Sequence, residues 1–150
     1  MKHGVMITLA GAAALAAAVA GCSSNSAGGQ KVSTSGHAKV VVDSQDQNVT
    51  GPVTCQKADG QLQIGIGQPG SPNVVAVQAT DAEPPVARQI SLGTVNGVAL
   101  AYQQGSPGAS AQAARDGNGY KFTGTATGLD KTNPMAGLVS KSFEVDATCP

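Results

Sequence analysis

The segment Gln61-Leu62-Gln63-Ile64-Gly65-Ile66 carries an apolar side chain at every second position, so that Leu62, Ile64 and Ile66 share one face. Alternation with a period of two over a short run is typical of a strand with one buried face. Asp59-Gly60 comes directly before this segment. Asx-Gly pairs tolerate the positive φ angles of tight hairpin turns. The segment therefore predicts an antiparallel strand that follows a hairpin turn.

Similar strand signals recur about every ten residues from Lys39 onward. Further runs are residues 73–79, 86–92, 98–102, 120–127 and 143–148, and further Asx-Gly pairs are Asn96-Gly97, Asp116-Gly117 and Asn118-Gly119. No segment after Gly21 shows an apolar period of helical type over three turns. We therefore expect an all-β fold, either an antiparallel β-sandwich or a flattened barrel, of about seven to nine strands.

The composition limits the classes of partner. The chain has 150 residues, which suits one domain of ordinary size. Nine Lys and Arg balance nine Asp and Glu, charged residues make up 12% of the chain, and aromatic residues make up 3% with no Trp. A nucleic-acid-binding surface needs basic side chains against phosphates and aromatic side chains for stacking. We therefore expect no nucleic-acid partner.

The N-terminal segment resembles an export signal. One Lys precedes an uncharged run over residues 5–20. As a helix, this run would span only about 24 Å, short of a bilayer core of roughly 30 Å, which argues against a permanent membrane helix. The tetrapeptide Val19-Ala20-Gly21-Cys22 follows and resembles a bacterial lipobox. We interpret residues 1–21 as a signal peptide that is cleaved between Gly21 and Cys22, with Cys22 lipidated. The alternative is a soluble secreted protein with an incidental cysteine.

The next segment, residues 22–38, is predicted to be a tether. It is rich in Ser and Gly and shows no apolar periodicity, so it cannot bury enough surface to form a core. Its hydroxyls, Ser33, Thr34 and Ser35 among them, are candidate O-glycosylation sites, and an unmodified linker is the alternative. No polybasic patch accompanies the signal, so the acyl chains would supply most of the attachment to the membrane. Residues 39–150 would form the β domain.

Two cysteines remain if Cys22 is acylated. Cys55 shares its strand face with Val53, and Cys149 shares its strand face with Val145. Both thiols therefore face the apolar side of their strands, as a bridge across a sandwich requires. An exported protein lies in an oxidising compartment where a disulfide persists. Two separately buried thiols are the alternative, whereas a metal site would need more ligands than two cysteines supply.

No residue pattern indicates catalysis. After signal cleavage one histidine remains, His37, at the edge of the tether, where it is a poor general base. The G-x-G-x-x-G match over residues 65–70 leads into strand residues, so we interpret it as a Gly/Pro loop and not as a nucleotide site. Glu144 and Asp146 lie on the polar face of a strand as solvated charges. We expect no catalytic residue, no cofactor and no metal.

Two blocks of sequence are more specific than generic β structure. Residues 41–55 read V-V-D-S-Q-D-Q-N-V-T-G-P-V-T-C, and residues 123–130 read T-G-T-A-T-G-L-D and lead through Asn133-Pro134-Met135 to the terminal Cys149. With these blocks the chain resembles the LpqH-type family of mycobacterial 19 kDa lipoprotein antigens, over the signal, the lipobox and nearly the whole domain.

The resemblance carries expectations about function. It implies a cell-envelope lipoprotein, exposed on the extracytoplasmic face or partly shed, whose acylated N-terminus is recognised by host Toll-like receptor 2. It places lipidation on Cys22 and a disulfide on Cys55 and Cys149, and it implies no catalytic residue. The alternative function is a carrier that holds an apolar ligand, a lipid or glycolipid, between the sheets. Small side chains over residues 74–77 and 98–101 would leave room for that ligand or would simply close-pack.

Overall fold

The structure is a computed structural model that describes residues 36–150. It contains ten strands and one short 3-10 helix. In chain order these are β1 (His37–Val42), β2 (Gln45–Asp46), β3 (Val53–Ala58), β4 (Gln61–Ile66), β5 (Val75–Thr80), β6 (Ala87–Val95), β7 (Val98–Gln103), β8 (Ser110–Asp116), β9 (Gly119–Asp130), η1 (Pro134–Ala136) and β10 (Leu138–Thr148). The predicted all-β class is confirmed, and the ten strands include β2, which has only two residues.

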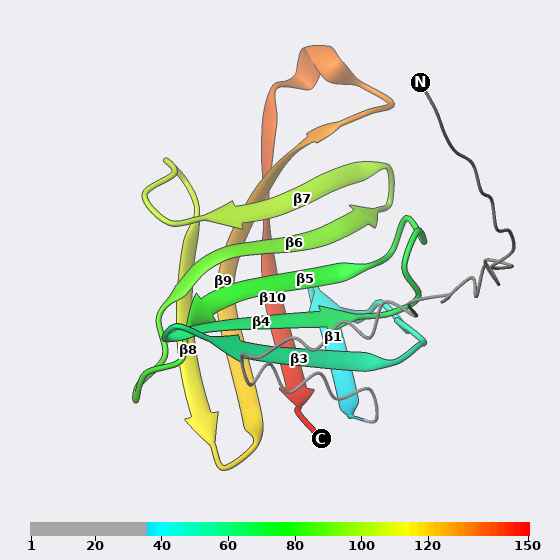
Figure 1. The fold of residues 1–150 in the computed structure, drawn as a ribbon. Coiled ribbons are helices and arrows are strands. Elements are labelled where there is room, and N and C mark those ends of the chain that lie inside the picture. The colour runs from blue at the N-terminus through cyan, green and yellow to red at the C-terminus, as the bar shows by residue number, and fades with distance from the viewer. Residues whose placement is uncertain (1–35) are drawn as a thin grey trace, which may run out of the picture.

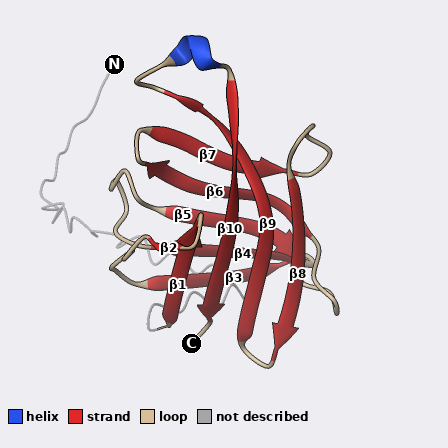
Figure 2. Ribbon diagram, turned by 180° about the vertical axis from the view of Figure 1, so that it is seen from behind, coloured by secondary structure: helices blue, strands red, loops and turns tan. Residues whose placement is uncertain are grey.

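The strands form one antiparallel sheet that bends over itself into a half-barrel. Their order is β2-β1-β10-β9-β7-β6-β5-β4-β3, and β8 pairs with β9 outside this path. Strands β3 to β7 lie roughly side by side along one axis, and β1, β8, β9 and β10 cross them steeply (Figure 1). From behind, the second group lies in front of the first (Figure 2). The two groups thus pack as crossed layers with one core between them.

Strand β9 carries the sheet from one layer to the other. Along one edge it pairs first with β8, over residues 119–125, and then with β7, over residues 127–130. Its other edge pairs with β10 almost throughout. A Cβ added at Gly124 would overlap the carbonyl oxygen of Ser110, and one added at Gly128 would overlap that of Ala99. The G-T-A-T-G motif therefore lets two strands, β8 and β7, approach β9 closely where the sheet bends.

The core is apolar throughout. Strands β1, β3 to β7, β9 and β10 each contribute buried side chains, and residues 36–150 contain no buried polar or charged residue. Leu62, Ile64 and Ile66 are all buried on β4, so the predicted face of that strand is confirmed. The alternation expected for β7 and for the end of β10 is present as well.

Two details differ from the expectation. Strand β1 begins at His37, which pairs with Thr148, so the strand starts two residues before the expected boundary at residue 39. His37 is exposed on this strand and does not lie on the tether. Strand β8 was not predicted, because its sequence SAQAARD contains mainly residues that do not favour strands.

Candidate functional site

The described chain begins beside a disulfide. Gly36 lies against the backbone of Thr148 and the side chain of Val53, and a Cβ there would overlap the Thr148 carbonyl oxygen. Cys55 on β3 is bonded to Cys149, which follows β10, with their Cα atoms 5.8 Å apart. Both cysteines are buried. The predicted disulfide is therefore present, and it links the two layers at the end of the molecule where the described chain begins.

The predicted modification sites lie outside the described residues. These are Gly21 and Cys22 for processing and lipidation, and Ser33, Thr34 and Ser35 for O-glycosylation. The structure places the start of the domain but none of these side chains.

A charged cluster closes one open edge between the layers. The Lys57 ammonium lies 3.0 Å from an Asp81 carboxylate oxygen, and the Arg115 guanidinium lies 3.6 Å from the same oxygen. The two cations also lie 5.3 and 5.5 Å from the ring centre of Tyr120. Contact with the Tyr120 phenol, followed by contact with Asp81, raises the pKa of Lys57 above its ordinary value. Strands β3, β8 and β9 and the end of β5 are thereby held together.

This cluster is structural in its chemistry. Tyr120 is buried, and its hydroxyl has no hydrogen-bond partner among residues 36–150. The cations flank its ring, and their charges are largely compensated by Asp81 and by Glu83, which lies 4.0 Å from Arg115. These contacts hold the strands in place.

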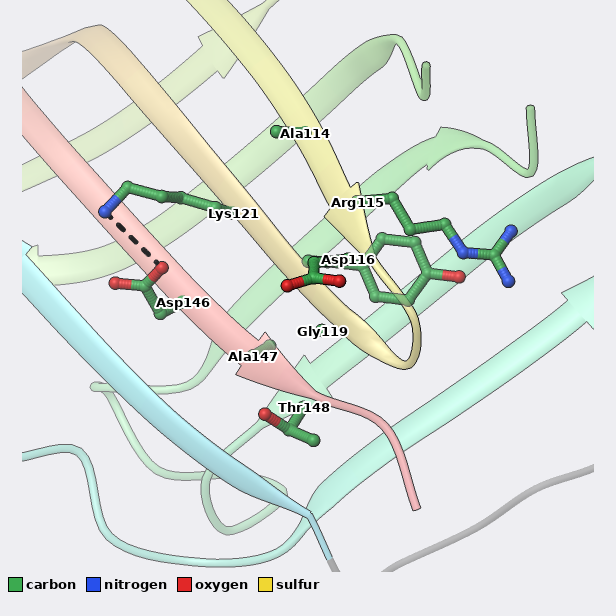
Figure 3. Close-up of a pocket in the computed structure, with 9 residues that line it drawn as sticks. Ala114, Arg115, Asp116, Gly119, Lys121, Asp146, Ala147 and Thr148 are labelled. Carbon is green, nitrogen blue, oxygen red and sulfur yellow. Dashed lines mark ion pairs between the residues drawn. The ribbon is translucent and has the colours of Figure 1, made fainter. Parts of the chain in front are cut away.

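A shallow groove of about 320 Å³ lies on the outer face of β8, β9 and β10. Figure 3 shows Lys121 facing Asp146 across neighbouring strands, at 3.7 Å. Lys121 also lies 3.1 Å from Glu144 and lowers the pKa of that carboxyl, whereas burial raises the pKa of Asp146. The predicted solvated carboxylates thus form a surface ion network around one lysine, not an acid and base facing a substrate.

A second cleft, of about 350 Å³, opens between the layers at the opposite end of the domain. Its walls include the buried side chains of Val42, Val98 and Leu100, and its rim includes Asp43 and Lys141. Lys141 pairs with Asp43 and lowers the pKa of that carboxyl. The cleft combines apolar walls with a charged, open rim. It is not the enclosed apolar cavity that would by itself favour a carrier.

The remaining sequence motifs form no site. Residues 67–70 of the G-x-G-x-x-G match belong to the turn between β4 and β5, and no helix follows them. Within residues 36–150, His, Cys, Asp and Glu side chains do not gather in groups of three or more that would hold a metal ion. In the same part of the chain, no helix has the length and apolar character needed to cross a membrane.

Comparison with known proteins identifies relatives along the whole chain. The sequence model of the Mycobacterium 19 kDa lipoprotein antigen family matches residues 31–149. Lipoprotein LpqH of Mycobacterium tuberculosis strain H37Rv is 44% identical over 161 residues, which cover 99% of each chain. Lipoprotein LpqH of Mycobacterium avium is 41% identical, and a putative lipoprotein of Mycobacteroides abscessus is 35% identical, each again over 99% of both chains.

Proposed function

The chain belongs to the Mycobacterium 19 kDa lipoprotein antigen family, and we propose on this basis that it is a non-catalytic lipoprotein of the cell envelope, anchored through acylated Cys22. The observation that carries the proposal is the full-length match to proteins named lipoprotein, together with the lipobox Val19-Ala20-Gly21-Cys22 of this chain. The acyl chains would hold the domain on the extracytoplasmic face of the membrane, from which part of the protein is shed.

The fold supports this role because it provides a stable body at the end of a tether. The chain enters the domain at Gly36, at the end closed by the disulfide, so the point where a tether would join the domain and the covalent link lie at the same end. The two clefts described above are lined by ion pairs or are open to solvent. We therefore infer that the protein acts through its presentation at the cell surface.

We assign recognition by host Toll-like receptor 2 to the acylated N-terminus. Two or three acyl chains on one residue form a strongly apolar group, since each buried CH₂ contributes about 0.8 kcal/mol. The β domain has no comparable apolar feature at the end where the tether begins. The receptor would therefore bind the lipid part of the molecule, and the domain would remain outside that contact.

The test is the Cys22→Ala substitution, read in cells that report Toll-like receptor 2 signalling. We expect the loss of essentially all signalling, because the substitution removes the only thiol available for acylation. The matched control is the double substitution Cys55→Ala and Cys149→Ala, which removes two thiols but leaves Cys22. It should signal like the wild type when the amount of acylated protein is equalised. A fully active Cys22→Ala protein would exclude the proposal.

A carrier of an apolar ligand is the second candidate, and the cleft lined by Val42, Val98 and Leu100 is the place where such a ligand would bind. Its ligand would place a chain between the layers and a polar group at Asp43 and Lys141. Native mass spectrometry of the secreted Cys22→Ala protein tests this function. A discrete adduct that disappears on denaturation would support the carrier, whereas a bare mass would leave the acylated N-terminus as the functional part.

A further inference from the structure

We propose that the hairpin at the end of the domain opposite the disulfide inserts its apolar tip into the membrane that holds the acyl anchor. The apolar tip consists of Leu129, Met135 and Leu138, which are 52, 95 and 70% exposed. It is formed by the end of β9, by η1 and by the start of β10. The inference rests on the proposed acyl anchor, because the anchor keeps a lipid surface close to the domain.

The apolar tip concentrates side chains that the rest of the domain buries. Residues 36–150 expose four large hydrophobic side chains, and three of them belong to this one hairpin. Leu129 and Leu138 are direct cross-strand partners, and Met135 lies in the turn between them. The hairpin projects beyond the neighbouring strands (Figure 1). A small, convex apolar point fits a fluid acyl layer better than it fits a flat protein surface, where it would bury little area.

The backbone of the turn suits an apolar environment, in which an amide without an acceptor is costly. The Thr132 and Asn133 amides donate to the Asp130 carboxylate, and the Ala136 amide donates to the Asn133 carbonyl. The Lys131 amide donates to the Gly97 carbonyl. Pro134 has no amide hydrogen to satisfy. Most of the turn's amides are therefore satisfied without water.

The charge beside the apolar tip also suits a lipid surface. Lys131 is exposed and makes no ion pair within residues 36–150. The other charged residue of the tip, Asp130, accepts hydrogen bonds from the Thr132 amide and hydroxyl within the turn. A long lysine side chain beside an apolar surface keeps its ammonium at the level of lipid phosphates while its methylenes lie deeper. Lys131 would therefore mark the depth to which the hairpin enters.

The tether is long enough for the tip to reach the anchoring membrane. Strand β10 has eleven residues and runs from the tip to the disulfide end, a span of about 36 Å at roughly 3.3 Å per residue. The chain from Cys22 to Gly36, fully extended, covers about 46 to 50 Å. The domain can therefore lie along the membrane with its tip and its anchor in the same leaflet.

A single introduced tryptophan tests the insertion, because the chain has none of its own. The acylated Met135→Trp protein is reconstituted into phosphatidylcholine vesicles with phosphatidylglycerol, prepared with and without brominated acyl chains. The matched control is Val86→Trp, at the one exposed large hydrophobic residue of the described chain that lies away from the tip. Both positions are on the surface, so both variants should fold.

We expect brominated lipid to quench the indole at position 135 at least about twofold more than the indole at position 86, since interfacial side chains lie roughly 5 to 10 Å below the surface. Equal, weak quenching at both positions would overturn the inference. Blue-shifted emission that rises with protein density but resists bromination would overturn it in favour of contact between copies. In a further sample, only added vesicles without protein contain brominated lipid. If quenching occurs only in that sample, the tip enters a second membrane and not the one that holds the anchor, which would overturn the inference.

The same preparations separate this inference from the proposed function. Acylation of the Met135→Trp protein is verified by its mass, and its receptor signalling is measured in reporter cells. Full signalling without quenching would refute the insertion and leave the proposed function intact. Quenching without signalling would refute the role in receptor recognition and leave the insertion intact.

Discussion

The two ends of the domain are held together in different ways. At the end where the described chain begins, a disulfide joins Cys55 to Cys149, which lie 94 positions apart, and the cluster of Lys57, Asp81 and Arg115 closes the nearby edge. At the other end, the apolar tip is held by a turn whose side-chain contacts reach only two or three residues from Asp130. The contacts at the first end resist separation of the two layers. The second end exposes the apolar tip, whose side chains contribute little to the packing of the core.

The difference shows where long-range contacts are needed. A half-barrel sheet leaves the layers unpaired along an open edge, so the disulfide and the ion cluster lie where the layers would otherwise separate. The tip lies beyond the region where the layers pack. Its apolar side chains therefore add nothing to the core, and they can be changed without unfolding the protein.

The largest effect on stability should follow loss of the disulfide, because this removes the long-range link that distinguishes one end of the domain from the other. The double substitution Cys55→Ala and Cys149→Ala should lower the free energy of unfolding by about 4 to 5 kcal/mol, because it releases a closed loop with a sequence separation of 94. Unfolding in guanidinium chloride measures the loss. The double substitution Met135→Ser and Leu138→Ser at the tip should leave the midpoint almost unchanged. A disulfide effect as small as that of the tip variant would contradict this comparison.

A smaller effect is expected at the bend of β9. Gly124→Ala should lower the free energy of unfolding by about 1 to 3 kcal/mol, because the new methyl group overlaps the Ser110 carbonyl oxygen and β8 must shift. The matched control is Gly65→Ala on β4, where a Cβ meets only the side-chain hydroxyl of Thr54. Thermal unfolding of the two variants compares them directly. Equal losses would show that the bend at β9 is not the constrained point.

The smallest effect should be the response of the tip to acid. The Thr132 hydroxyl, followed by the Thr132 and Asn133 amides, lowers the pKa of Asp130 below its ordinary value. Because folding favours the ionised form, this contribution is complete above the unfolded pKa and is lost as pH falls below about 4. The Thr132 and Asn133 amide resonances should therefore titrate below the usual Asp range. In an Asp130→Asn variant that titration should vanish while the unfolding midpoint stays nearly constant.

Much of the fold was predictable because its signals are local. The alternation of Leu62, Ile64 and Ile66 gave the buried face of β4, and the shared parity of each cysteine with its apolar neighbours indicated the disulfide. Strand β8 was not predicted, because Ala, Gln and Arg have little preference for strands of their own. Its pairing with β9 holds it in the sheet. Tertiary pairing thus decided what the local sequence left ambiguous.

The surface features were less accessible to sequence reasoning. Asn133-Pro134-Met135 was informative as a family motif, yet its projection into solvent depends on how far β9 and β10 extend beyond the packed layers. The Tyr120 cluster brings together Lys57 and Arg115 from strands far apart in sequence. No spacing rule places such residues together, because only the bend of the sheet does so.

The position of the disulfide also determines whether a proteolytic cut can separate the chain into two pieces. Strands β4 to β10 all lie between Cys55 and Cys149, so a cut in any of their loops leaves both fragments joined by the sulfur atoms. If the protein carries the proposed acyl anchor at Cys22, only cleavage between Cys22 and Cys55 would release the domain from the membrane. A cut elsewhere would leave both fragments attached through the disulfide.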